Sequence, residues 1–114
     1  MKIAFTAKGN DWDSKIDPRF GRTEFILIYD DKKDELMHYD NREIESVAHG
    51  AGPQTAQKLF EFKPDVLITG NGPGGNAARV LNESGIKIFI GAGEMSIKES
   101  LAAYNDGGLQ EFKI

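Results

Sequence analysis

The spacing of apolar residues along the chain predicts strands in its first third and alternating strands and helices after it. Short runs rich in β-branched and aromatic residues are typical of strands. Five such runs occur in the chain: residues 3–6, 25–29, 36–39, 66–69 and 86–90. The second and third runs are joined by a short charged turn and predict a hairpin. The tail, residues 109–112, is a further candidate for a short edge strand.

Three helices are expected between and after the later strands. The first begins near Pro53, because proline suits the first helical turn, and a second follows Asn76 and ends at Gly85. Ser96 and Glu99 form a capping box that starts the third. Strand–helix–strand alternation favours parallel pairing with right-handed crossovers. The predicted fold class is therefore α/β, with a mixed five-stranded sheet flanked by helices, in a single domain over residues 1–114.

Composition narrows the function classes. Hydrophobic residues make up 39% and charged residues 28% of the 114 positions, and the net charge is −4. This acidic balance argues against nucleic acid and anionic membranes as partners. Residues 1–5 read as a strand rather than a signal peptide, and no apolar run approaches the ~20 residues that span a bilayer. We therefore expect a cytoplasmic protein.

The chain contains no cysteine. Disulfides, thiolate ligation of zinc or of iron–sulfur clusters, and cysteine nucleophiles are therefore excluded. Neither a G-x-S-x-G elbow nor an H-E-x-x-H motif is present. A metal-dependent hydrolase or nuclease would need clustered carboxylates at strand ends, and residues 3–6 carry none. We expect no catalytic residues and a protein that is not an enzyme.

Two glycine-rich turns, Gly70–Asn76 and Gly91–Ser96, follow predicted strands and lead into predicted helices. Glycine permits close approach of the backbone to a ligand, and ligands of open α/β sheets bind at such strand ends. The spacing matches neither the dinucleotide fingerprint nor the phosphate-binding P-loop. The alternative is that these glycines only make tight turns. Occurring together, the two turns favour a shared ligand crevice.

A polar loop and a lone histidine are further candidates. Arg19 and Arg22 flank Phe20–Gly21, and arginine forks suit carboxylates, phosphates or an anionic cluster. The alternative is a pair of solvated arginines, with Phe20 plugging the edge of the core. His49 stands on a glycine-flanked loop before the first helix, where it could bind a metal or carry a proton. A solvated histidine is the alternative.

Together, these motifs resemble those of one family over nearly the whole chain. In chain order they are D-x-R-F-G-R at residues 17–22, H-G-x-G at 49–52, G-x-G-P-x-x-x-A at 70–77 and the strand and turn at 86–91. Their order and spacing resemble the dinitrogenase iron–molybdenum cofactor biosynthesis family. The resemblance implies a ribonuclease-H-like three-layer α/β fold without nuclease chemistry. It also implies transient binding of an anionic iron–sulfur or iron–molybdenum cluster precursor, with cofactor donor and acceptor proteins as partners.

The resemblance also assigns site residues. In cofactor-carrying relatives a histidine precedes the Phe–Gly pair, and Arg19 stands there in this chain. His49 is then the imidazole left near a motif, and so the candidate metal ligand. The expected cofactor-binding residues are Arg19, Phe20, Gly21, Arg22, His49, Gly50, Gly52, Gly70, Gly72 and Gly91. The alternative function is a regulatory module that binds a small anion or a nucleotide at the glycine-rich turns.

Overall fold

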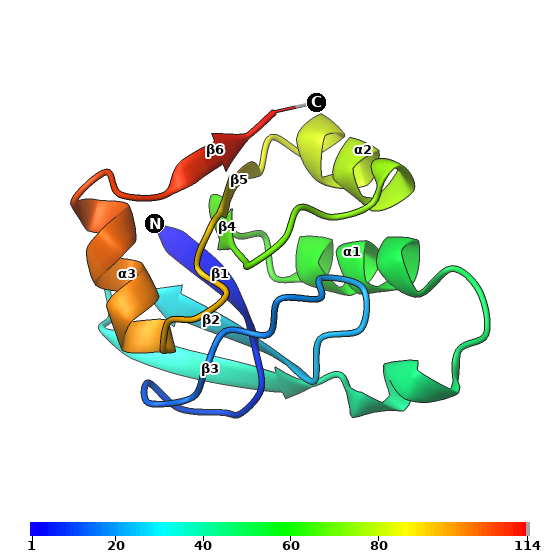
Figure 1. The fold of residues 1–114 in the computed structure, drawn as a ribbon, viewed down its shortest axis with the longest axis horizontal. Coiled ribbons are helices and arrows are strands. Elements are labelled where there is room, and N and C mark those ends of the chain that lie inside the picture. Colours follow the sequence, from blue (N-terminus) through cyan, green and yellow to red (C-terminus); the bar gives the residue numbers. More distant parts are fainter. Residues whose placement is uncertain (114) are drawn as a thin grey trace.

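The computed structural model describes residues 1–113, which form a six-stranded mixed sheet with helices on both faces (Figure 1). Across the sheet the strand order is β3-β2-β1-β4-β5-β6. β1, β4 and β5 run parallel, whereas β2, β3 and β6 are antiparallel to their neighbours. The strands are β1 (Lys2–Ala7), β2 (Phe25–Asp30), β3 (Glu35–Asp40), β4 (Val66–Ile68), β5 (Lys87–Ile90) and β6 (Gln110–Phe112).

The α/β class, the hairpin and the parallel half of the sheet are confirmed, but the expectation of five strands is wrong. The sixth strand, β6, forms an edge beside β5, with Phe112 opposite Ile88. Phe112 packs against the core cluster that contains Ile88, and this contact fixes a strand of only three residues. The sequence signal was weak because so short a strand carries one large apolar side chain.

The helices are α1 (Ala51–Glu61), α2 (Gly75–Glu83) and α3 (Ile97–Asn105). α1 and α2 lie side by side on one face of the sheet, and α3 covers the other (Figure 1). The capping box of α3 is present: the Ser96 hydroxyl accepts from the Glu99 N–H, and the Glu99 carboxylate accepts from the Ser96 N–H. A short 3-10 helix, η1 (Arg42–Ser46), occupies part of a segment that the sequence left irregular.

The central strands β1 and β4 have apolar side chains on both faces, as is typical of parallel strands covered on both sides. Ala4 contributes to the cluster beneath α1 and α2, and Phe5 to the cluster beneath α3. Where β1 and β4 end, the hydroxyls of Thr6 and Thr69 lie 2.7 Å apart in a buried hydrogen bond. This polar contact marks the edge of the sheet at which the loops converge.

Among the described residues, no helix has both the length and the apolar character needed to cross a bilayer.

Candidate functional site at the carboxyl edge of the parallel strands

The loops that follow β1, β4 and β5 meet at one edge, because parallel strands end on the same side of a sheet. Backbone hydrogen bonds join all three loops. The Asn71 N–H donates to the Pro18 carbonyl, and the Gly91 N–H donates to the Gly70 carbonyl, each at 3.1 Å. The expectation that the two glycine-rich turns lie next to each other is therefore met by direct contact, and the loop after β1 joins them.

Close approach of neighbouring backbones explains why glycine occupies positions 70 and 21. A Cβ on Gly70 would lie 2.7 Å from the Pro18 Cα, which is too short for any side chain, and 3.1 Å from the Gly93 Cα, which is a tight contact. A Cβ on Gly21 would lie 3.0 Å from both Cα and N of Gly52, in the first turn of α1. These glycines pack the loops against one another, so their presence alone does not indicate a ligand.

The remaining candidate glycines differ in their surroundings. A Cβ on Gly72 would meet the Phe112 ring at 2.8 Å, so this glycine makes room for β6. Gly50 and Gly91 have φ of +78° and +100°, a region that favours glycine. Gly74 and Gly75 do not have positive φ, and within residues 1–113 nothing lies within 4 Å of a Cβ added to either. They leave an open surface at the start of α2, where no side chain of the described residues caps the first turn.

Asp17 organises the loop that carries the arginines. Its side chain is completely buried, and its carboxylate accepts hydrogen bonds from the N–H groups of Arg19 and Glu24 and from the Arg19 guanidinium. The Asp17 carbonyl also accepts from the Thr6 hydroxyl at 2.7 Å. Asp17 opens the D-x-R-F-G-R motif, which by itself did not indicate this role. Its signal is the Asx-turn pattern, in which an aspartate accepts from the N–H two residues on.

Arg19 and Arg22 both reach η1. Nη1 of Arg19 lies 3.7 Å from Oε1 of Glu45, and Nη1 of Arg22 donates to the Ile44 carbonyl at 2.8 Å. The Arg19 side chain is 51% exposed, and its hydrogen bond to Asp17 holds its pKa above the usual range. Arg19 thus presents a permanent positive charge at the surface of this edge, with Glu45 as a competing carboxylate.

Phe20 and His49 occupy opposite environments. Phe20 is 4% exposed and packs in the cluster with Ala56, Leu59 and Ala77, so its ring lies inside the domain. His49 is exposed on the turn between η1 and α1, three residues before Gly52. Within residues 1–113 there is no group of three or more His, Asp or Glu side chains that could hold a metal ion. His49 could therefore supply one metal ligand at most. The remaining contacts to a bound anion would come from backbone N–H groups and arginine.

The chain is thus an open α/β domain whose packed loops lie at the carboxyl edge of its parallel strands, where ligands of open α/β sheets bind. The chain belongs to the dinitrogenase iron–molybdenum cofactor family, whose model matches residues 1–107. This confirms the family expected from the motifs at Asp17, His49 and Gly70.

Solved structures agree with the family assignment. The apo form of the orange protein from Desulfovibrio gigas is 31% identical, covers 97% of this chain and 92% of its own, and superposes with a TM-score of 0.91. A putative NifB protein from Thermotoga, determined by NMR, is 30% identical over 99% of this chain and 97% of its own, with a TM-score of 0.81. No curated protein sequence matches the chain significantly.

Proposed function

We propose that this protein is a non-catalytic carrier that binds an anionic iron–sulfur or iron–molybdenum cofactor precursor at the carboxyl edge of β1, β4 and β5. The observation that carries the proposal is the direct contact of three loops there: Pro18 meets Gly70 and Gly93. All four motifs of the resemblance meet at this edge, with Arg19 at its surface and His49 three residues before Gly52. Membership of a family described by the iron–molybdenum cofactor supports this choice of cargo.

The chemistry of the available groups suits a carrier. With no cysteine in the chain, a bound cluster keeps its own sulfides and the protein supplies few bonds to metal. The Arg19 guanidinium attracts a polyanion, backbone N–H groups can donate to sulfide or oxygen, and the His49 imidazole can coordinate one metal. Few ligands allow release, which a carrier needs. Cofactor donor and acceptor proteins are then the expected partners, and the ribonuclease-H-like description of the fold stays a prediction.

A second candidate function is binding of a small anion or a nucleotide at the start of α2. The observation that favours it is the open surface at Gly74 and Gly75, next to the uncapped N–H groups of the first helical turn. Such N–H groups attract anions. A thermal-shift series with phosphate and nucleotides tests this function, because a ligand that binds only the folded state raises Tm.

Cluster retention tests the carrier proposal. The protein is incubated anaerobically with an isolated iron–molybdenum–sulfur cluster, passed through a desalting column and analysed for iron and molybdenum. We expect the natural sequence to retain both metals and His49→Ala to retain less. His38→Ala is the matched control, because His38 is the other histidine of the chain and lies exposed on β3. Absence of retained metal, or equal losses in the two variants, would contradict the proposal.

A further inference from the structure

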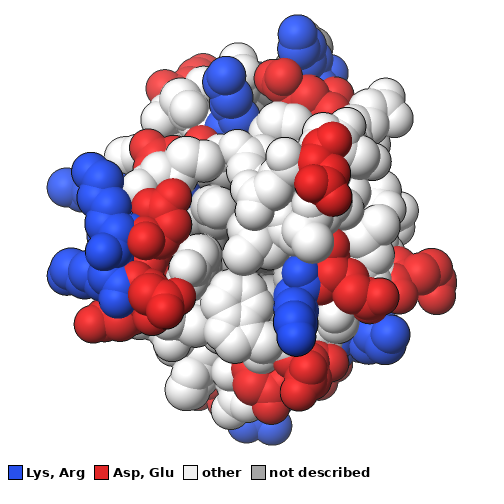
Figure 2. Space-filling model, turned by 90° about the vertical axis from the view of Figure 1, so that its left-hand side faces the viewer, with Lys and Arg blue, Asp and Glu red and all other residues white. Residues whose placement is uncertain are grey.

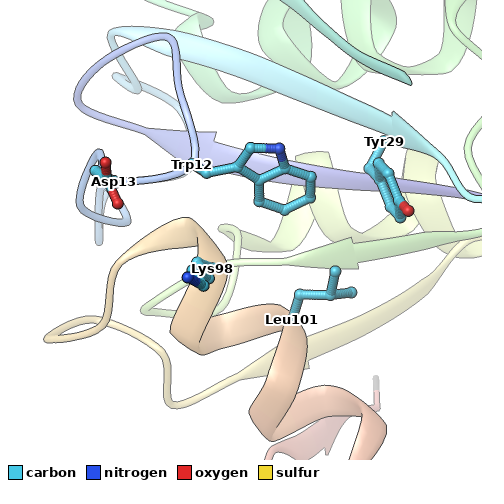
Figure 3. A pocket seen from close by; sticks show the side chains of 5 residues that line it. All are labelled: Trp12, Asp13, Tyr29, Lys98 and Leu101. Atoms are coloured by element: carbon cyan, nitrogen blue, oxygen red, sulfur yellow. The ribbon is translucent and has the colours of Figure 1, made fainter. Parts of the chain in front are cut away.

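A groove on the α3 side of the sheet is separate from the carboxyl-edge site. It has a volume of about 450 Å³ and is lined by Trp12, Asp13, Tyr29, Lys98 and Leu101. Figure 3 shows Trp12 and Tyr29 on one side of this groove, with Lys98 and Leu101 of α3 on the other. The volume is within the range of small-molecule sites, about 300–1,000 Å³. None of the five side chains belongs to the motifs at the carboxyl edge.

Hydrogen bonds fix the walls of the groove to each other. The Lys98 N–H donates to the Trp12 carbonyl at 3.0 Å, and the Ile97 N–H donates to the Ser14 carbonyl at 2.8 Å. The loop that carries Trp12 therefore caps the first turn of α3 and holds that turn in place. Because its two sides are hydrogen-bonded to each other, the groove is formed before any ligand binds. Less conformational entropy is then lost on binding.

Aromatic rings form one wall. Trp12 packs edge-to-face on Tyr29, with ring centroids 5.0 Å apart at 73°, and on Phe5 at 6.3 Å and 74°. Its indole is thus held in place, yet the side chain is only half-buried. Leu101 adds apolar surface on the opposite side. This combination suits a flat apolar or aromatic group of a ligand.

The polar groups of the groove are unused. Within residues 1–113 the Lys98 ammonium has no carboxylate within 4.0 Å, the Trp12 indole N–H has no acceptor, and the Asp13 carboxylate accepts no hydrogen bond. The Tyr29 hydroxyl, in contrast, is engaged: it donates to Asp34 at 2.8 Å, which raises the pKa of Tyr29. The groove therefore offers a cation and a carboxylate beside the aromatic wall.

The face of the molecule that carries α3 is mixed in charge. Figure 2 looks at the side of the molecule that carries α3, and uncharged surface runs through its centre between acidic and basic side chains. A purely cationic ligand would meet Lys98, and a purely anionic one would meet Asp13. A ligand that carries both an anionic group and an N–H donor satisfies both.

We propose that the groove binds a small planar aromatic molecule that carries one anionic group and one amino or ring N–H donor. The ring packs against Trp12, Tyr29 and Leu101, the anionic group accepts from Lys98, and the donor pairs with Asp13. Aminobenzoates and purine nucleotides share this chemistry. Binding here does not depend on the cofactor-carrier proposal, because the groove uses none of its residues.

The test uses the one tryptophan of the chain. Its indole gives a single ¹H–¹⁵N cross-peak, and this peak is followed while ¹⁵N-labelled protein is titrated with 4-aminobenzoate in one series and AMP in another. Adenosine and inorganic phosphate are controls that each lack one part of the ligand. We expect saturable movement with at least one of the two complete probes, and weaker binding of both controls. Which probe binds distinguishes a carboxylate from a nucleotide ligand.

Variants complete the test. Lys98→Gln weakens binding by about fivefold, the size expected for one exposed charge-assisted contact, and Lys98→Arg retains it. Lys32→Gln is the matched control, since Lys32 is an exposed lysine outside the groove. The dispersed amide spectrum of each variant verifies folding. No indole shift up to about 10 mM probe, a range that includes very weak complexes, would overturn the proposal, as would equal binding by Lys98→Gln and the natural sequence.

Discussion

Arg19 is held by Asp17 through two parallel contacts: its Nε lies 3.2 Å from one carboxylate oxygen, and its Nη2 lies 3.3 Å from the other. The carboxylate is completely buried, whereas half of the arginine side chain is exposed. The buried Asp17 carboxylate thus orients the exposed guanidinium of Arg19. The loop after β1 is consequently a preformed element of the candidate site.

Asp17→Asn is expected to destabilise the protein by about 2–3 kcal/mol, the usual cost of breaking buried charge-assisted hydrogen bonds. The amide of asparagine would place N–H groups against the donors of Arg19 or Glu24. Urea denaturation measures the free energy of unfolding. Asp13→Asn is the matched control on an exposed aspartate and should change stability by no more than about 0.5 kcal/mol. Similar effects in both variants would show that Asp17 does not organise the loop.

Gly70→Ala should lower the free energy of unfolding by about 1–3 kcal/mol. The added Cβ would overlap the Pro18 Cα, so the two loops would have to separate. Gly75→Ala is the control within the same turn. Within residues 1–113 nothing lies within 4 Å of its added methyl, and alanine favours the helix that begins there. The free energy of unfolding of this variant should therefore rise by about 0.5–1 kcal/mol. Thermal unfolding of the two variants compares them directly, and a stable Gly70→Ala variant would contradict the backbone contact.

Glu45→Gln should strengthen binding of an anionic cluster by roughly two- to fivefold, because it removes the carboxylate that competes for Arg19. The gain should shrink as salt is added, since the contact is exposed. Glu43→Gln, on the same 3-10 helix but in no ion pair among residues 1–113, is the control. Anaerobic titration followed by metal analysis gives the affinities. Equal effects of the two substitutions would mean that only net charge matters.

Asp40 supplies a prediction on pH. Hydrogen bonds from the Arg42 side chain and backbone lower the pKa of Asp40 to about 2. A depressed carboxyl pKa stabilises the native state above the ordinary value and loses that contribution as pH falls through the native one, here from about 4 to about 2. Arg42→Gln should move the pKa of Asp40 back towards 3.8. An NMR titration of the Asp40 carboxyl carbon measures it, and an unchanged midpoint would exclude Arg42 as the cause.

The regular part of the fold could be predicted because its signals are local. Apolar runs marked the buried strands, and Ser96 with Glu99 marked the start of α3. β6 was underestimated because its pairing depends on one long-range contact, that of Phe112 with the core. The 3-10 helix η1 was missed because a tertiary hydrogen bond stabilises it, the one from the Arg22 guanidinium to the Ile44 carbonyl.

The candidate site was predicted as a set of motifs but not as a set of contacts. The sequence indicated that Gly70 and Gly91 lie at one edge, and it could not show that Pro18 would touch Gly70 or that Glu45 would face Arg19. Those relations join residues far apart in the chain. The glycines also had two possible explanations, and only the geometry separated Gly70, which is required by packing, from Gly74 and Gly75, which are open.

The most direct test of the carrier proposal is a map of where the cluster binds. ¹⁵N-labelled protein is titrated anaerobically with an isolated iron–molybdenum–sulfur cluster, and the amide cross-peaks are followed residue by residue. We expect shifts or broadening confined to residues 17–24, 49–52, 70–76 and 91–96. Effects centred on the Trp12 groove, or an unchanged spectrum at saturating cluster, would contradict it.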